Sequence, residues 1–297
     1  MSALSRRNFL QCSAAALASA SLLQTRLARS AEKKGGEIRY GLVTYQWAKD
    51  WDLPTLIANC AKTNVLGVEL RTTHKHGVEP SLNAAERAEV RKRFEDSPVQ
   101  FVGIGSDERF DNPDPAVVKK AIDASKAFIV LSHDVGGTGV KVKPDRFWPN
   151  VPREKTIEQI GKALNELGEY AEGFGQQVRL EVHGQCQELP TIKAIMDVAT
   201  HPSVAVCWNS NPADLAGDGL EHNFNLVKDR LGATSHIHLL DSDAYPFQKL
   251  LDLYVQIDYQ GWWLLEEGKI PADPVAELAR QRELFDKMLA DSRNRVG

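Results

Sequence analysis

The stretch VRLE, residues 178–181, is a short β-branched run that ends on a carboxylate, Glu181. Three later runs also carry a polar side chain at or near their end: VAVCWN (204–209), HIHL (236–239) and WWLLE (262–266), with Asn209, His238 and Glu266. Each run predicts a buried parallel strand, because amphipathic helical patterns alternate with these runs. In a barrel of such units, the residues at the carboxyl ends of the strands converge on one mouth.

Eight strand-then-helix units follow one another along the chain. The predicted strands are residues 38–44, 65–70, 99–105, 128–132, 178–182, 204–208, 236–239 and 262–265. The predicted helices are residues 53–63, 84–94, 116–126, 157–174, 189–198, 220–231, 246–253 and 275–290. Eight α/β units in about 250 residues favour a closed (β/α)8 TIM barrel over an open sheet. No linker interrupts them, so we predict a single domain over residues 31–297.

The first 30 residues have the pattern of an export signal. SRRNFLQ, residues 5–11, carries twin arginines, an apolar run follows over residues 12–23, and ARS at 28–30 has small residues at a cleavage spacing. This order is typical of a twin-arginine (Tat) signal peptide over residues 1–30, the alternative being an amphipathic helix of the mature protein. We therefore expect export by the Tat pathway and a periplasmic location. No later segment has the roughly 20 apolar residues of a membrane span, so we expect no membrane attachment of the mature form.

Charge and cysteine content narrow the function classes. The net charge is −4, and without residues 1–30 it becomes −8, because that segment holds four arginines and no acidic residue. An acidic chain without a cluster of basic residues argues against nucleic acid as a partner. The three later cysteines, Cys60, Cys186 and Cys207, show neither CxxC spacing nor a disulfide framework.

The polar strand ends predict a metal site. Two carboxylates, an amide oxygen and an imidazole are suitable ligands for a divalent ion, and the candidates are Glu181, Asn209, His238 and Glu266. Strand alternation places His236 and His238 on the same face, with His238 nearer the carboxyl end of the strand. We therefore expect His238 at the mouth and His236 deeper, as a core histidine.

The segments LEVHG, CWNSNPAD, HIHLLD and GWWLLEE resemble the xylose-isomerase-like barrel superfamily of sugar isomerases and epimerases. The resemblance covers nearly all of the chain after residue 30, in order and spacing. In that family a glutamate, an aspartate, a histidine and a glutamate end strands five to eight and hold one divalent ion, commonly Mn, Mg, Co or Zn. It implies that Glu181, Asn209, His238 and Glu266 are the ligands. Asn209 stands where the family has aspartate, and its uncharged oxygen weakens affinity for a hard cation, so metal occupancy stays open.

The resemblance also implies the chemistry. A metal bridging a ketone and its neighbouring hydroxyl stabilises an enediolate, while one carboxylate removes a carbon-bound proton and another returns it. Glu181 and Glu266 are the expected acid–base pair, and His183 is expected to polarise a substrate oxygen unless it is a surface-loop residue. The expected substrate is an unphosphorylated small-molecule sugar.

Other residues near strand ends are expected to bind that substrate. These candidates are Trp47, Glu69, Arg71 and His133. The alternatives are core packing for Trp47 and an internal ion pair between Glu69 and Arg71. The long segment 133–155, which contains the glycine-rich GGTG and Trp148, is predicted to cover the mouth.

Two further functions remain open. A lyase or hydrolase-like enzyme acting on 3-keto-glycosides would use the same metal and the same proton abstraction. A metal-free carbohydrate-binding barrel would have lost catalysis with the change to Asn209. With each of the three functions the protein can also be a homo-oligomer.

Overall fold

The computed structural model describes residues 35–296. The predicted signal peptide, residues 1–30, lies outside the described residues and stays a prediction.

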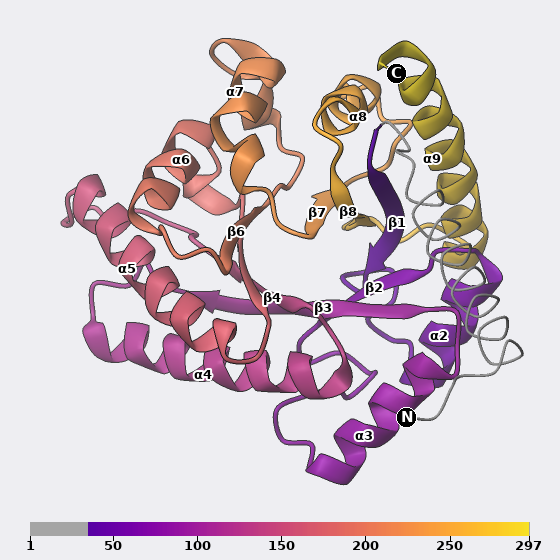
Figure 1. The fold of residues 1–297 in the computed structure, drawn as a ribbon, viewed down its shortest axis with the longest axis horizontal. Coiled ribbons are helices and arrows are strands. Elements are labelled where there is room, and N and C mark those ends of the chain that lie inside the picture. Colours follow the sequence, from indigo (N-terminus) through magenta and orange to yellow (C-terminus); the bar gives the residue numbers. More distant parts are fainter. Residues whose placement is uncertain (1–34, 297) are drawn as a thin grey trace, which may run out of the picture.

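Eight parallel strands form the barrel, with the helices lying outside them (Figure 1). The strands are β1 (Glu37–Val43), β2 (Gly67–Arg71), β3 (Gln100–Arg109), β4 (Gly139–Lys143), β5 (Gln177–Glu181), β6 (Val204–Cys207), β7 (Thr234–Ile237) and β8 (Gln260–Leu265). They pair in the order β6-β5-β4-β3-β2-β1-β8-β7. The prediction of a single-domain (β/α)8 TIM barrel is confirmed.

The barrel closes between β6 and β7, just beyond the end of β6. The amide of His236 donates to the carbonyl of Trp208 at 2.6 Å, and the amide of Ser210 donates to the carbonyl of His236 at 3.2 Å. Asn209 and His236 form the isolated parallel bridge at this seam. Asn209, a predicted metal ligand, and His236 therefore lie where β6 meets β7 and the barrel closes.

Helices cover the outside of the barrel. They are α2 (Leu53–Lys62), α3 (Ala84–Glu95), α4 (Pro115–Val135), α5 (Arg153–Glu172), α6 (Leu189–Val198), α7 (Gly219–Val227), α8 (Phe247–Gln256) and α9 (Pro274–Val296). Short 3-10 turns, η1 (Gly184–Cys186), η2 (Pro212–Leu215) and η3 (Lys228–Arg230), lie in the connections. Within residues 35–296, no helix combines the length and the apolar character that crossing a membrane requires.

The interior of the barrel is divided between apolar and charged side chains. A small cluster of Val43, Val102, Trp262 and Leu264 fills one part, separate from the large core between strands and helices. Alternation along the strands turns charged residues of β2, β4 and β5 to the same interior. The three cysteines of the described part, Cys60, Cys186 and Cys207, are buried and free.

The fourth strand differs from the prediction. Residues 128–132 continue α4 to Val135, where Gly136 ends the helix with a left-handed φ of 93°. The apolar run FIVLS fits either a strand or a buried helix, and the buried positions Ala121, Ser125 and Phe128 show the helical spacing. The true fourth strand is GVKVK at residues 139–143, so the connection over the mouth shortens to residues 144–152.

Candidate active site

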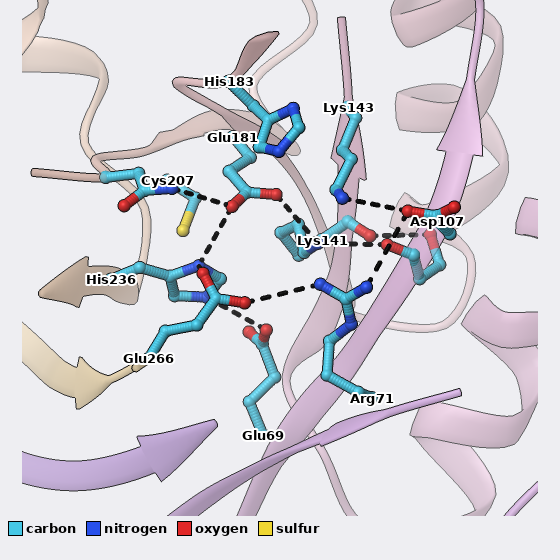
Figure 2. A network of polar contacts seen from close by, with 12 residues as sticks. Glu69, Arg71, Asp107, Lys141, Lys143, Glu181, His183, Cys207, His236 and Glu266 are labelled. Carbon is cyan, nitrogen blue, oxygen red and sulfur yellow. Dashed lines mark hydrogen bonds and ion pairs between the residues drawn. The ribbon is translucent and has the colours of Figure 1, made fainter. Parts of the chain in front are cut away.

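Charged side chains from five strands meet at the carboxyl end of the barrel (Figure 2). The residues of this cluster are Glu69 on β2, Lys141 on β4, Glu181 on β5, His236 on β7, and Asn209 and Glu266 just after β6 and β8. All of them are buried. Burial of so many charges requires each to have a partner, so the contacts define what the site can do.

His236 is the centre of the cluster. Its Nδ1 lies 3.3 Å from Oε1 of Glu181 and 3.2 Å from Oε2 of Glu266, and its Nε2 lies 3.0 Å from Oε1 of Glu69. Burial by itself lowers the pKa of His236, but Cys207, Glu69 and Glu266 outweigh it and raise that pKa well above the ordinary value. The ring therefore carries a positive charge among three carboxylates and keeps them in place.

Glu181 has a partner on each oxygen. Lys141 Nζ lies 2.8 Å from Oε2, while the amide nitrogen of Asn209 donates to Oε1 at 3.0 Å. Lys141 also donates to the carbonyl of Ser106 at 3.0 Å. Burial raises the pKa of Glu181, but the charges of Lys141 and His236 outweigh it and hold that pKa well below the ordinary value. Glu181 is therefore a carboxylate, not a carboxylic acid.

Glu266 joins the cluster to the mouth. Arg71 Nη1 lies 3.4 Å from Glu266 Oε1, and Arg71 Nη2 lies 3.8 Å from Asp107. Asp107, half exposed, also receives Lys143 at 2.9 Å. Burial raises the pKa of Glu266, but chiefly the charge of His236 lowers it to about 2. Glu266 is thus an ionised base at the level where a substrate would enter.

His183 is held at the mouth by a carboxylate. Its Nδ1 lies 2.7 Å from Oδ1 of Asp145, whose other oxygen is 2.7 Å from Nε of Arg109. The side chain of His183 is 34% exposed, and its ring lies above Glu181 in Figure 2. A carboxylate on one ring nitrogen orients the imidazole and leaves the other nitrogen for a ligand.

The donor set can hold a divalent ion. Ligand atoms of Glu181, His236 and Glu266 lie within 4.8 Å of one another. The side-chain oxygen of Asn209 is buried and has no hydrogen-bond partner among residues 35–296, so a fourth donor atom is available. Carboxylate, imidazole and amide donors suit Mn, Mg, Co or Zn in general terms.

The comparisons place this geometry in a known family. The model of the xylose isomerase-like TIM barrel family matches residues 57–288. The chain belongs to this family. Among the curated proteins, the sequence has no significant match.

Solved structures share the fold of this xylose isomerase-like barrel. An L-ribulose 3-epimerase superposes with a TM-score of 0.71 at 14% identity, covering 87% of this chain and 97% of its own. The 3-keto-D-glucoside 4-epimerase of E. coli gives 0.70 at 14% identity, with 84% and 100% covered. A protein named IOLI with a bound zinc atom gives 0.69 at 14% identity, with 86% and 99% covered. These likenesses show the fold.

The xylose isomerase-like barrel brings Glu181, Asn209 and Glu266 together, but with His236 instead of His238. His236 is buried and lies deeper than His238, as expected, but it also contacts Glu181 and Glu266, which was not expected of a core histidine. The side chain of His238 is 41% exposed, and its Nδ1 donates to the backbone carbonyl of Glu266 at 2.7 Å. Ligation by His238 stays a prediction.

The four expected substrate-binding residues lie in different places. Glu69 and Arg71 lie at the cluster, but they contact His236 and Glu266, respectively, and no ion pair joins them in the described structure. Trp47 is buried in the core, and its indole nitrogen donates to the carbonyl of Lys269 at 2.8 Å. His133 does not end a strand: it lies in the last turn of α4 with its side chain 49% exposed.

Two residues of the site were not among the predicted candidates. Lys141 and Asp145 both fall in the segment 133–155, which was predicted to be a connection over the mouth. The alternation in GVKVK is the signal for Lys141, because it predicts a strand with both lysines on one face. No local pattern marks Asp145, whose role depends on His183, 38 residues away.

A cavity adjoins the mouth of the barrel. Its volume is about 470 Å³, and Asp107, Arg109, Asp111, Arg146 and Trp148 are among the residues that line it. The indole nitrogen of Trp148 donates to Asp111 Oδ2 at 2.9 Å. Asp107 lines this cavity and also contacts Arg71, so the cavity and the cluster are neighbours.

Proposed function

We propose that this protein is an isomerase or epimerase that acts on an unphosphorylated sugar by moving a carbon-bound proton. The observation that carries the proposal is the pair of buried carboxylates, Glu181 and Glu266, which meet at the same nitrogen of His236, with Nδ1 3.3 Å from Glu181 Oε1 and 3.2 Å from Glu266 Oε2. Two bases at one position are what removal and return of a proton require. The solved structures of sugar epimerases with the same fold support this choice.

The residues have distinct expected tasks. Glu266 lies nearest the mouth and removes the proton next to the substrate carbonyl, which gives an enediolate. Glu181 is the second carboxylate of the pair: it takes up a proton from solvent and delivers it at the other face or the adjacent carbon, while Glu266 releases the abstracted proton to solvent. Arg71 and His183 hold substrate oxygens as negative charge develops on them. His236 holds the two carboxylates at their separation.

Glu181, His236, Glu266 and Asn209 would hold a divalent ion, with the zinc-bound IOLI structure as support from the same fold. Such an ion would supply Lewis-acid polarisation of a substrate oxygen. Export to the periplasm, which the pattern of residues 1–30 predicts, is part of the proposal. It favours an unphosphorylated sugar, because sugar phosphates are chiefly cytoplasmic.

The cavity beside the mouth favours a second candidate, elimination from a 3-keto-glycoside. Its 470 Å³ and its Trp148 ring offer room for a second sugar or another aglycone beyond the reacting ring. A structure titled 3-keto-D-glucoside 4-epimerase has the same fold. Proton removal by Glu266 would be the common first step, followed by departure of the glycosidic oxygen.

The test is proton exchange with solvent. The protein is incubated in D₂O with free ketoses, aldoses and 3-keto-glycosides, with Mn²⁺ present, and deuterium at carbon is followed by NMR. We expect incorporation into one substrate class, reduced roughly 10²–10⁴-fold in Glu266→Gln. Glu267→Gln is the matched control, because Glu267 is the adjacent carboxylate and lies outside the cluster.

The products separate the two candidates. An isomeric sugar supports isomerisation or epimerisation, while release of the aglycone supports elimination. Absence of exchange with every sugar in the panel, in a protein that binds one of them, would instead support the carbohydrate-binding barrel.

A further inference from the structure

Lys141 is a positive charge that the chain itself supplies inside the metal-donor set. Its side chain is 0% exposed, and its Nζ lies 2.8 Å from Glu181 Oε2 and donates to the Ser106 carbonyl at 3.0 Å. Because it stands on β4 between β3 and β5, the barrel fixes its position. Lys143, two residues further along the same face, extends to Asp107 at the mouth instead.

Each carboxylate of the cluster already faces a basic group. Glu69 contacts His236, Glu181 contacts Lys141, and Glu266 contacts Arg71. The sixth member, Asn209, brings no negative charge. A divalent ion is attracted by uncompensated negative charge, and this cluster has little of it.

Each oxygen of Glu181 also already faces a positive charge or a donor. Oε2 receives Lys141, and Oε1 receives the Asn209 amide at 3.0 Å, with His236 Nδ1 at 3.3 Å. A metal that binds Glu181 would share this carboxylate with a buried ammonium group. Two cations on one buried carboxylate repel each other strongly, because the surroundings screen them poorly.

We propose that Lys141 is an internal competitor of the metal, which occupies Glu181 and keeps the affinity of the site for divalent ions low. This inference concerns metal affinity and goes beyond the proposed reaction. It assigns Lys141 to neither substrate binding nor proton transfer.

The test measures binding of the metal alone. Purified protein is stripped with a chelator and titrated with Mn²⁺ and with Zn²⁺ by calorimetry, and bound metal is counted by elemental mass spectrometry after dialysis. We expect Lys141→Met to bind with a Kd at least tenfold lower than the parent. Lys143→Met is the matched control, because it removes an inward lysine of the same strand that contacts no proposed ligand, and we expect it to leave Kd unchanged.

Lys141→Met leaves a buried carboxylate without its partner, so its folding requires a separate measurement. We expect Mn²⁺ to raise the unfolding temperature of Lys141→Met more than that of the parent. The double variant Lys141→Met with Glu181→Gln removes both charges, and we expect it to fold without metal and to bind metal no more tightly than the parent.

Equal or weaker metal binding in Lys141→Met would overturn the inference, as would a parent that keeps one equivalent of metal through chelation. A Lys141→Met protein that metal does not stabilise, beside a double variant that folds, would also overturn it. The deuterium-exchange test is independent: its failure would remove the sugar reaction and leave the metal result standing.

Discussion

The Asn209 side chain determines whether Glu181 faces a hydrogen-bond donor or a second negative charge. Its amide nitrogen donates to Glu181 Oε1 at 3.0 Å, a contact that an aspartate would replace with two facing carboxylates. We predict that Asn209→Asp lowers the free energy of unfolding by about 1–3 kcal/mol without metal, because like charges would face each other in a buried place. Denaturant unfolding with and without Mn²⁺ measures this, and added metal should recover most of the loss. A variant as stable as the parent without metal would contradict the prediction.

Asp214 gives a pH-dependent prediction away from the cluster. This carboxyl is buried and accepts from the hydroxyl of Tyr245 at 2.7 Å and from the amide of Asn211 at 2.9 Å. Burial raises its pKa to about 7. The folded protein therefore keeps the proton in a range where the unfolded chain has lost it. The stability from this group is complete below about pH 4 and is lost as pH rises towards 7.

The variant Asp214→Asn isolates this effect, because it keeps an acceptor for Tyr245 and does not titrate. We predict that the parent, relative to this variant, loses on the order of 4 kcal/mol of unfolding free energy between pH 4 and pH 8. Urea unfolding at several pH values measures the difference. A difference that does not change with pH would show that Asp214 is ionised in the folded protein.

Single residues were predictable where strand ends marked them, and less so where partners lie far apart in sequence. Glu181, Asn209 and Glu266 end their runs and come together in the structure. His236 is the deeper of the two histidines, as expected, but its contacts with the carboxylates were not predicted, because they depend on where β7 meets β6, which the local pattern does not contain.

At the scale of elements, α4 is the instructive case. The pattern predicted seven of the eight strands, the seventh two residues too late, but the run FIVLS was assigned to a strand although it continues a helix. A short apolar run has no period that separates these two structures, and only the left-handed Gly136 that follows marks the helix end. The shift moved Lys141 from a loop into the barrel interior.

Two glycines after helices test this account of the α4 end. Gly136 follows α4 with φ 93°, whereas Gly173 follows α5 with φ −60°. We predict that Gly136→Ala lowers the unfolding free energy by about 1 kcal/mol, because an L side chain is strained at positive φ. Gly173→Ala is the matched control and should be neutral or slightly stabilising, since its added Cβ meets nothing closer than 3.5 Å. Urea unfolding of both variants compares them, and equal effects would contradict the argument.

The backbone hydrogen bonds between neighbouring strands are distributed unevenly around the barrel. Neighbouring strands pair through ladders of several residues, while β6 and β7 meet through the isolated bridges near Val206 and Asn209. We predict that the amides of Ser210 and Gly232 exchange with solvent earlier than those of β4 and β5, because fewer hydrogen bonds hold the seam. Hydrogen–deuterium exchange followed by mass spectrometry measures the order. Equal protection around the barrel would show that the seam is as stable as the ladders.

The eightfold alternation was visible in the sequence because each strand is buried on both faces and each helix on one. Closure was predicted from the number of units, but the residues at which the last strand meets its partner were not, because no local pattern marks them. That meeting takes place at Asn209 and His236.

The seam therefore has a second consequence. The residues that complete the barrel also complete the candidate site, since the backbone of His236 closes the barrel while its imidazole contacts both Glu181 and Glu266. A partly assembled chain cannot expose a finished centre to sugars around it. The candidate site is therefore complete only when β6 and β7 have paired, and we expect its activity to be lost when that pairing opens.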